Sequence, residues 1–443
     1  MGQTAILHRI FRECGMKIST DSRSVEQGSV FFALKGENFD GNIFVKAALE
    51  AGAAYAVAEV LPEGWDENDK RVILVDDTLK ALQQLASYHR ENTLHNGKRL
   101  KILALTGTNG KTTTKELINA VLSTRYRVTA TSGNFNNNLG VPLTLLRLTE
   151  DTELAVVEMG ASHPGDIKEL VDIAHPDFGL ITNVGRAHLL GFGSFEGVKN
   201  TKGELYDYLR GVRGQCFVNA DSSDLMEMVD KREGLIVIPY GASCMNVSIN
   251  PSDAAHPFLS LNFEHEGRQY RVNTNLVGSY NRDNVLAALA VGLEFGIGIQ
   301  DAVAAIEAYV PNNKRSQLCQ GQYNTLIVDA YNANPSSMAA ALDNFASIQS
   351  GRKALFLGDM LELGAESATE HRKVLDKVES LENVEFVALV GKEFAAADSE
   401  GRHHCFATSD EAAAYVSAHP VHDALCLVKG SRGTRMEKIL PVL

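Results

Sequence analysis

Short apolar runs alternate with amphipathic, helix-like segments along most of the chain. After residue 100 the runs are KILALT, LAVVEMG, FGLITNVG, QCFVNAD and GLIVIPYG, in which Val, Ile and Leu are frequent. Helical segments such as PGDIKELVDIA lie between several of them. Because strands buried on both faces are typical of parallel sheets, this alternation predicts an α/β fold with helices covering a parallel sheet.

Changes in this pattern divide the chain into three predicted domains, at residues 1–98, 99–310 and 311–443. The first block mixes short strands with turns, and its polar run at residues 89–98 predicts a linker. A polar, alternating stretch at residues 250–275 predicts a β-hairpin. The α/β alternation then restarts with TLIVDAYN, KALFLGDM, EFVALVGKE and ALCLVKGS. We therefore expect a mixed α/β domain, a central parallel-sheet domain and a smaller α/β domain.

Charge and composition exclude several classes of protein. The 443 residues include 42 Lys and Arg against 55 Asp and Glu, a net charge of −13, which does not suit duplex DNA or anionic lipid. We therefore expect no nucleic-acid partner. No run of about 18 apolar residues is present, and the first residues lack a signal-peptide core, so we expect no membrane insertion. The six scattered cysteines predict a reduced, cytoplasmic protein.

The stretch LALTGTNGKTT, residues 103–113, joins an apolar run to a glycine-rich turn and then to Lys111 and Thr112. A helix is predicted to follow, since the apolar residues 117, 118, 121 and 122 fall on one stripe. Glycines let backbone N–H groups surround phosphate oxygens, and a helix N-terminus adds partial positive charge. Lys111 would reach the β- and γ-phosphates, and the Thr112 hydroxyl would hold Mg²⁺. Leu105 stands where the strict P-loop pattern has glycine, so the alternative is an ordinary strand-to-helix turn.

Two further polar side chains follow apolar strands. Glu158 ends the run LAVVE, and His188 comes shortly after FGLITNVG. Ligands of α/β sheets bind outside the carboxyl ends of the strands, where a carboxylate is a natural Mg²⁺ ligand. The alternatives are a solvent-facing glutamate and a structural histidine.

Lys202 is unusual because it lies on an apolar helix stripe. At ~100° per residue, the apolar residues 195, 198, 205 and 209 fall with it in one arc of roughly 80°. Such a lysine can extend along the surface and keep its amine in water. The alternative is a desolvated amine with a lowered pKa, which can take up CO₂ and become a carbamate that binds metal.

These stretches resemble the Mur ligases, which are ATP-dependent carboxylate–amine ligases related to the folylpolyglutamate synthases. The resemblance rests on TGTNGKTTT, on Lys202-Gly203-Glu204, and on SGNFNNNLGVPLTLL and NRDNVLAALAVG. It implies two Mg²⁺ ions, one held by Thr112 and Glu158 and the other by His188 and a carbamylated Lys202. It also implies a UDP-substrate domain, a central P-loop ATPase-like domain and a C-terminal Rossmann-like domain that closes over ATP.

The resemblance assigns further residues to the ATP site and to catalysis. Asn138 matches an active-site asparagine, and Lys111 acts on the transferring phosphoryl group. The implied ATP-binding residues are Thr106, Gly107, Thr108, Asn109, Gly110, Lys111, Thr112, Thr113, Asn281, Asn284 and Asp329.

The motifs DAYNANPSS, LGDMLELG and KGSRGTRME are similar to those of the Mur ligases that add D-alanyl-D-alanine to UDP-N-acetylmuramoyl-tripeptide. The DNPR signature expected of the ligase that adds the third residue is absent. For the DAYNANP stretch alone, an Asx-type turn is the alternative. The implied dipeptide-binding residues are Tyr331, Asn332, Asn334, Lys429, Ser431 and Arg432.

The first block, STDSRSVEQGSVFFALKGENFDGNIF, resembles the UDP-sugar-binding domain of the family. Ser22, Arg23, Lys35 and Gly36 would hold uridine and pyrophosphate, for which a guanidinium fork is well suited. The alternative is a turn in which Arg23 only pairs with a neighbouring aspartate. The family usually has DGHxF where this chain has Asn42 in place of the histidine.

The implied reaction begins when the tripeptide carboxylate attacks the γ-phosphate of ATP and forms an acyl phosphate and ADP. The amine of D-alanyl-D-alanine then attacks the acyl phosphate. We expect a monomer. The alternatives are another ligase of the same family, a P-loop switch or motor, and a nucleotide-sugar-binding protein without activity. The chain contains no NKxD motif, which a guanine-specific switch would need.

Overall fold

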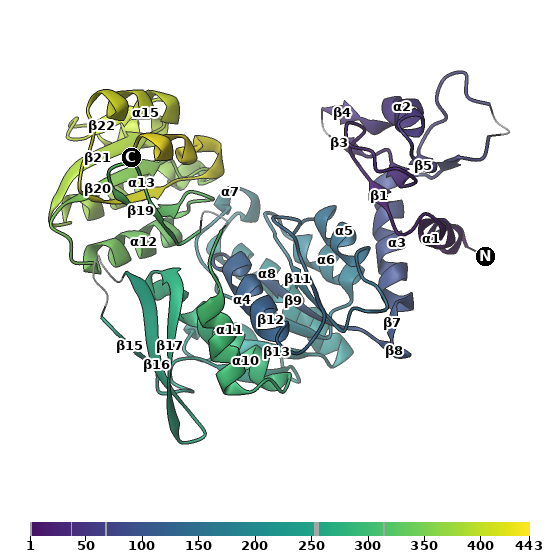
Figure 1. Cartoon of the computed structure of the whole chain (residues 1–443), viewed down its shortest axis with the longest axis horizontal. Helices are drawn as coiled ribbons and strands as arrows, with labels where there is room; N and C mark the ends of the chain where they lie inside the picture. Colours follow the sequence, from purple (N-terminus) through teal and green to yellow (C-terminus); the bar gives the residue numbers. More distant parts are fainter. Residues whose placement is uncertain (1, 37, 67–68, 252–256, 313–314) are drawn as a thin grey trace. The chain divides into compact units, whose positions relative to one another are not determined.

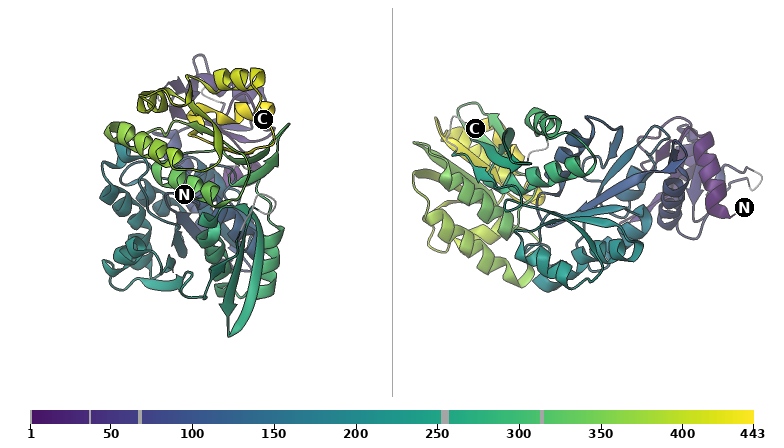
Figure 2. Two further views of the ribbon diagram at one scale, coloured as in Figure 1. Left: turned by 90° about the vertical axis from the view of Figure 1, so that its left-hand side faces the viewer. Right: turned by 90° about the horizontal axis from the view of Figure 1, so that it is seen from below.

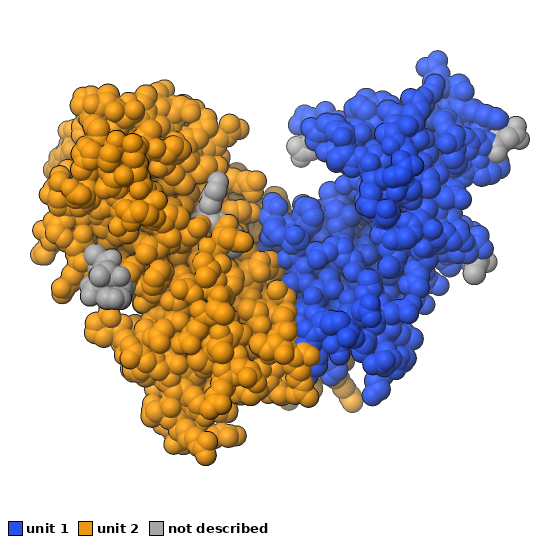
Figure 3. All heavy atoms as spheres, in the orientation of Figure 1, with its two compact units in different colours: residues 1–104, 126–160, 166–178 blue, residues 105–125, 161–165, 179–443 orange. Residues whose placement is uncertain are grey.

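The computed structural model describes residues 2–36, 38–66, 69–251, 257–312 and 315–443. The described chain divides into two compact units, shown in Figure 3. The first unit comprises residues 1–104, 126–160 and 166–178, and the second comprises residues 105–125, 161–165 and 179–443. The domain boundaries after residues 98 and 310 stay predictions.

The first unit contains a four-stranded sheet in the order β1-β2-β5-β6, with parallel pairing throughout. All three residues of β2 and the last three of β5 are buried. The elements before residue 100 are α1 (Gln3–Glu13), β1 (Ile18–Ser19), β2 (Val30–Phe32), β3 (Lys35–Gly36), β4 (Phe39–Asp40), α2 (Val45–Glu50), β5 (Tyr55–Ala58), β6 (Val72–Leu74), α3 (Thr78–Asn92), β7 (Leu94–His95) and β8 (Lys98–Arg99).

The sheet predicted after residue 100 has six strands in the order β10-β11-β9-β12-β13-β14. Its outer strand pairs, β10–β11 and β13–β14, are parallel, as the sequence predicts. Its elements in chain order are β9 (Lys101–Thr106), α4 (Lys111–Leu122), β10 (Val128–Ala130), α5 (Gly140–Leu145), β11 (Leu154–Glu158), α6 (Asp166–Ala174), β12 (Phe178–Ile181), α7 (Leu189–Phe192), α8 (Phe195–Val212), β13 (Gln215–Asn219), α9 (Ser223–Asp230) and β14 (Ile236–Tyr240).

The predicted β-hairpin is confirmed. Strands β16 (Phe258–His265) and β17 (Arg268–Val277) pair antiparallel, and β15 (Ser248–Ile249) adds to β16 (Figure 1). The chain then returns through α10 (Arg282–Glu294) and α11 (Ile299–Ala308). Both helices contact α4, which follows the glycine-rich turn.

A second six-stranded sheet, in the order β18-β19-β23-β20-β21-β22, is parallel except at β18. Helices cover both faces of this sheet (Figures 1 and 2). Alternate strand residues face opposite sides, so Ile327 and Leu355 pack with α12 and α13, whereas Val328 and Phe356 pack with α15. The elements are β18 (Gln317–Gln320), β19 (Thr325–Asp329), α12 (Pro335–Ser347), β20 (Lys353–Gly358), α13 (Ser367–Glu379), β21 (Val384–Val390), α14 (Lys392–Ala397), β22 (His404–Phe406), α15 (Ser409–Ala418) and β23 (Leu425–Lys429).

The linker prediction for residues 89–98 is wrong at its start. His89 and Arg90 belong to α3 and are completely buried. Arg90 pairs with Asp177 at 3.1 Å and donates to the carbonyl of Ala174, so its charge is neutralised inside the unit. Sequence polarity suggested exposure, but partners from distant segments make burial of these groups stable. Among the described helices, none is long and apolar enough to cross a membrane.

His89 makes the stability of the first unit sensitive to acid. Its Nε2 donates to the Leu148 carbonyl at 2.8 Å, so its Nδ1 accepts from His8 Nε2 at 3.1 Å. Burial lowers the pKa of His89 from 6.5 to about 4. The unfolded chain therefore binds the proton more tightly, and about 3 kcal/mol of stability should be lost as the pH falls from 6.5 towards 4.

Denaturant unfolding followed at several pH values checks this prediction. His89→Gln keeps a donor for the Leu148 carbonyl but does not titrate, so its stability should fall less steeply below pH 6.5. A variant whose stability declines as steeply as that of the parent would show that His89 is not the acid-sensitive group.

Candidate active site

The glycine-rich turn has the predicted strand–turn–helix context, since β9 ends at Thr106 and α4 begins at Lys111. Gly107 and Gly110 have φ values of 145° and 78°, which side chains with a Cβ atom rarely adopt. A Cβ atom at Gly107 would lie 1.9 Å from Thr182 Oγ1. The turn thus needs glycine at both positions, and it leads directly into the N-terminus of α4.

Contacts from the chain after β12 hold the turn. The backbone N–H of Thr108 donates to the Asn183 carbonyl at 2.9 Å, and that of Asn109 donates to Asn183 Oδ1 at 3.0 Å. Thr182 Oγ1 donates to the Asn109 carbonyl at 2.6 Å. Lys111 folds back over the turn, where Nζ donates to the carbonyl of Gly107 at 2.8 Å. The ammonium group therefore lies over the loop that is predicted to hold phosphate.

Lys202 lies inside α8 and is only 3% exposed. Its Nζ lies 5.7 Å from the centroid of the Phe192 ring. Burial, and then the charge of Lys111, lower the pKa of Lys202 from 10.5 to about 7. The surface-extended alternative is therefore wrong, and the desolvated amine is confirmed. At pH 7 about half of such amines are neutral, against roughly 0.03% of ordinary lysines.

His188 directly precedes α7 as its N-cap residue and has a left-handed conformation, with a φ of 51°. Burial lowers its pKa, Glu362 acts in the opposite direction, and the charges of Lys111 and Lys202 lower it further. Lys111, His188 and Lys202 thus feel one another's charge, although 91 residues separate the first from the last. The structure brings these three predicted residues into one neighbourhood of the second unit.

Glu158 and Asn138 belong to the first unit. Glu158 ends β11 and is 1% exposed, and its Oε1 accepts a 2.9 Å hydrogen bond from Asn136 Nδ2. The backbone carbonyl of Asn138 accepts from Gln83. No pattern in the sequence distinguishes Asn136 from its neighbouring asparagines as the partner of Glu158.

The two asparagines predicted to contact ATP from α10 are both buried. Asn284 Oδ1 accepts from Thr114 Oγ1 at 3.0 Å and lies against Gly110, while its Nδ2 donates to Asn281 Oδ1 at 2.8 Å. Asn281 Nδ2 in turn donates to the Val277 carbonyl. This chain of hydrogen bonds links the start of α10 to the glycine-rich turn.

The DAYNANP stretch joins β19 to α12 as predicted. Asn334 caps α12 through a reciprocal pair of bonds with Ser337, and Pro335 occupies the first turn. Asn334 Nδ2 also donates to Asn109 Oδ1 at 2.8 Å. Asn334 thus has the turn-forming role that the alternative interpretation, an Asx-type turn, predicts. It also contacts the predicted phosphate loop.

Other predicted residues of this region make contacts within the protein. Lys429 is 1% exposed, and its Nζ lies 2.5 Å from Asp329 Oδ2. Ser431 Oγ accepts from the Leu361 N–H at 3.0 Å. Asn332 accepts from the next backbone N–H. Lys429 and Ser431 thus support the loops of the site.

Arg315 is a residue that the sequence did not single out. Its guanidinium lies 3.8 Å from the centroid of the Tyr331 ring, and the Arg432 guanidinium lies 5.5 Å from the same centroid. Within the described residues, the buried Nε of Arg315 has no hydrogen-bond partner. A buried donor of this kind suits an anionic ligand, but a lone arginine after a coil carries no sequence pattern.

The residues predicted to hold the UDP group lie in a turn and in strand β3 of the first unit. The Arg23 guanidinium pairs with Asp21, and this contact lowers the pKa of Asp21 to about 2. Lys35 pairs with Glu59 at 2.5 Å and precedes Gly36 in β3, and Ser22 lies in the turn before Arg23. Arg23 thus pairs with a neighbouring aspartate, as the alternative interpretation of this stretch predicts.

Asn42, which departs from the family pattern, is buried. Its Nδ2 donates to Asp40 at 2.6 Å, and its Oδ1 accepts from the backbone N–H of Glu59 at 2.8 Å. The asparagine therefore has a structural role at this position.

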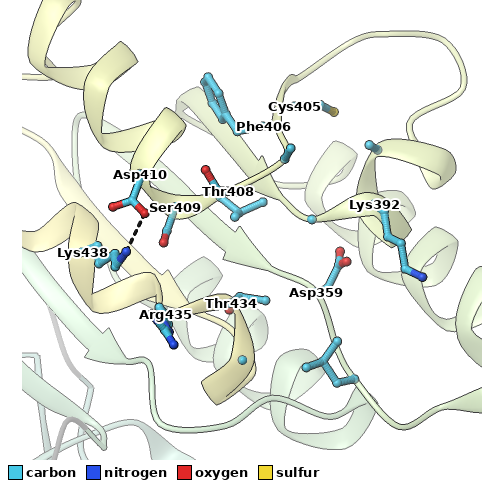
Figure 4. Close-up of a pocket in the computed structure, with 16 residues that line it drawn as sticks. Asp359, Lys392, Cys405, Phe406, Thr408, Ser409, Asp410, Thr434, Arg435 and Lys438 are labelled. Carbon is cyan, nitrogen blue, oxygen red and sulfur yellow. Dashed lines mark hydrogen bonds and ion pairs between the residues drawn. The ribbon is translucent and has the colours of Figure 1, made fainter.

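A cavity of about 780 Å³ lies at the carboxyl ends of β20, β21 and β22 (Figure 4). Its lining includes Asp359, Phe406, Ser409 and Arg435, and Lys438 pairs with Asp410 at its edge. None of the predicted site residues lines this cavity.

Comparison with known proteins identifies related chains along almost the whole length. The models of the Mur ligase family catalytic domain, the Mur ligase middle domain and the Mur ligase glutamate ligase domain match residues 17–90, 105–292 and 314–432. The UDP-N-acetylmuramoyl-tripeptide–D-alanyl-D-alanine ligase of Bacillus subtilis (strain 168) is 36% identical over 434 residues, which cover 96% of this chain and 92% of the relative.

Solved structures agree with this similarity. A crystal structure of MurF from Acinetobacter baumannii has a TM-score of 0.84 at 32% identity and covers 96% of this chain and 92% of that one. MurF ligase from Thermotoga maritima in complex with ADP has a TM-score of 0.84 at 25% identity and covers 100% of this chain and 98% of that one.

Proposed function

Because the chain belongs to the Mur ligase family, we propose that it joins D-alanyl-D-alanine to the carboxylate of UDP-N-acetylmuramoyl-tripeptide at the expense of ATP. The observation that carries the proposal is the similarity, over 96% of the chain, to a ligase named for this reaction. The products are UDP-N-acetylmuramoyl-pentapeptide, ADP and phosphate. The enzyme thus acts in the synthesis of a peptidoglycan precursor.

The electrostatic problem of the reaction is to bring two anions together. The tripeptide carboxylate must approach the γ-phosphate, and at ~4 Å two like unit charges repel by about 4 kcal/mol at an effective dielectric of 20. Lys111 supplies positive charge over the glycine-rich turn, next to the start of α4, where a helix N-terminus favours phosphate. Lys111 thereby stabilises the charge on the transferring phosphoryl group.

The chemistry of His188 and Lys202 fits a metal ion. Burial lowers the pKa of His188 and so favours the neutral imidazole that binds metal, and the Lys202 amine is neutral often enough to take up CO₂. Thr112 and Glu158 are proposed to hold one Mg²⁺, and His188 with a carbamylated Lys202 to hold a second. Bound Mg²⁺ would neutralise phosphate charge and polarise the γ-phosphoryl group.

Residues of the C-terminal α/β region are proposed to complete the site. Asp329 would contact the ribose, and Arg315 with its unpaired Nε would meet nucleotide phosphate. Tyr331 and Arg432 are proposed to help bind the dipeptide. The Asn334–Asn109 hydrogen bond holds this region against the phosphate loop, which helps to exclude water that would hydrolyse an acyl phosphate.

Further residues are assigned in the first unit and in the nucleotide site. We propose that the UDP group is held by Ser22, Arg23, Lys35 and Gly36. Arg23, which pairs with Asp21 in the structure, would then bind phosphate instead. The remaining proposed contacts are Asn138 in catalysis, Asn281 and Asn284 with adenine, and Asn332, Asn334, Lys429 and Ser431 around the dipeptide. We further propose a monomer that works in the cytoplasm, where its free cysteines stay reduced.

Phosphate release tests the proposed function. The purified protein should release phosphate from ATP only when UDP-N-acetylmuramoyl-tripeptide is present, and fastest with D-alanyl-D-alanine as well. A P-loop switch would hydrolyse ATP without either substrate, and a binding protein without activity would release no phosphate. Either result would contradict the proposal.

A further inference from the structure

Glu362 approaches the predicted metal ligand His188 from a different sheet. It lies four residues beyond the end of β20, and its Oε2 contacts His188 Nδ1. The Glu362 side chain is 59% exposed, so it is accessible to a ligand. The residue also has a φ of 65°, a left-handed conformation that is rare for residues other than glycine, asparagine and aspartate. Such strain persists only where the surroundings impose it.

Neighbouring side chains fix the segment that precedes Glu362. The N–H of Met360 donates to His371 Nε2 at 3.0 Å, and the N–H of Leu361 donates to Ser431 Oγ at 3.0 Å. His371 is completely buried and oriented by the Ser367 carbonyl at 2.8 Å. Both N–H groups are thus held by side chains from separate segments. The backbone that leads into Glu362 is consequently held in place.

Asp359 anchors the start of the same segment. Its carboxylate accepts from the backbone N–H groups of Glu393 and Phe394 at 3.0 and 2.9 Å, and its own N–H donates to the Val390 carbonyl at 2.9 Å. The Asp359 carboxylate therefore caps α14 and is occupied by these two hydrogen bonds. The Glu362 carboxylate instead contacts His188. Of the two acids in this segment, Glu362 is the one able to bind a ligand.

The negative charge of Glu362 does not favour binding of the anionic substrates. ATP and the UDP-linked tripeptide are anions, and the charge of Lys111, which would attract them, acts on His188. A carboxylate there repels both substrates. In the proposed reaction, the dipeptide amine, which is an ammonium ion before it reacts, is the substrate group with positive charge at the reacting centre.

We propose that the Glu362 carboxylate binds the ammonium group of the incoming dipeptide and so places the amine next to the acyl phosphate. The proposal rests on the proposed function and assigns a specificity-determining residue to its second substrate. In the present structure the His188 ring contacts the carboxylate, and the ammonium group would replace it. Charge-assisted hydrogen bonds of this kind are among the stronger polar contacts in proteins.

The test uses the full-length Glu362→Gln variant, which keeps size and hydrogen-bonding capacity but removes the charge. The KM for D-alanyl-D-alanine should rise roughly 10- to 100-fold, while the KM values for ATP and the tripeptide should change less than about twofold. Glu362→Asp retains the charge and tolerates the left-handed backbone, so it should recover part of the loss.

A second readout separates dipeptide binding from support of His188. Without dipeptide, hydroxylamine traps the acyl phosphate as a hydroxamate, and Glu362→Gln should form it at the parental rate. A variant that loses hydroxamate formation would overturn the proposal, because Glu362 would then act on the first step by holding His188 or a metal ion. An unchanged KM for D-alanyl-D-alanine would overturn it as well.

Glu366→Gln is the matched control. Glu366 lies four residues beyond Glu362, at the end of a short 3-10 helix, and pairs with Arg186 at 3.1 Å; its side chain is 46% exposed. Its KM for the dipeptide should equal that of the parent. Parental enzyme that forms neither phosphate nor hydroxamate with its substrates would contradict the proposed function itself, whereas an active parent with an unaffected Glu362→Gln variant would contradict only the role of Glu362.

Discussion

Replacing Lys111 with alanine is expected to reduce phosphate release by at least roughly 10²- to 10³-fold, the range found when a preorganised charge-stabilising group is removed. The Lys111 ammonium lies over the glycine-rich turn, held by the carbonyls of Gly107 and Thr108 at 2.8 and 3.2 Å. Its loss leaves the carboxylate and the γ-phosphate to repel each other. Phosphate release with all substrates present measures the effect.

Binding of the uridine nucleotide provides the control for Lys111→Ala. The proposed UDP residues Arg23 and Lys35 belong to the first unit, so titration calorimetry with the UDP-linked tripeptide should give the parental affinity. Lys168→Ala, which removes a 69% exposed lysine, should leave both readouts unchanged. Equal loss of turnover and nucleotide binding in Lys111→Ala would indicate misfolding and would contradict the assigned role.

Replacing Lys202 with alanine is expected to remove most activity, and a short carboxylic acid such as acetate should restore part of it. The reason is that the proposed carbamate supplies anionic oxygens, which an added carboxylate can imitate in the space left by the side chain. Phosphate release measured against acetate concentration tests this. A Lys202→Ala variant with normal activity, or one that acetate never rescues, would contradict the carbamate.

The same lysine should lower the stability of the fold. Its pKa is about 7 in the folded chain against 10.5 for the ordinary group, so the unfolded chain binds the proton more tightly. The cost, of the order of a few kcal/mol, is complete below pH 7 and disappears as the pH rises towards 10.5. Lys202→Met should therefore be more stable than the parent at pH 6 in CO₂-free buffer, with a difference that shrinks at higher pH.

Local patterns predicted the elements that carry the site. Apolar runs located β9, β11, β12 and β19, and the stripe that contains Lys202 reported burial correctly because a helix places residues three and four apart on one face. The start of α12 at Pro335 followed from the same local rules.

These local patterns could not predict contacts between residues that lie far apart in the sequence. Glu362 contacts His188 across 174 residues, and Arg90 is buried because Asp177 neutralises it across 87 residues. Neither partner leaves a periodic signal in the sequence. Periodicity reports which face of an element is buried, whereas the identity of the contact depends on the tertiary fold.

The acyl-phosphate step is tested most directly by the fate of the tripeptide's carboxylate oxygen. UDP-N-acetylmuramoyl-tripeptide labelled with oxygen-18 in its terminal carboxylate is incubated with ATP, D-alanyl-D-alanine and the enzyme, and the released phosphate is analysed by mass spectrometry. Attack of the carboxylate on the γ-phosphate predicts one labelled oxygen in each phosphate released. Phosphate without the label, and labelled instead when the water carries oxygen-18, would show hydrolysis of ATP and contradict the ligase mechanism.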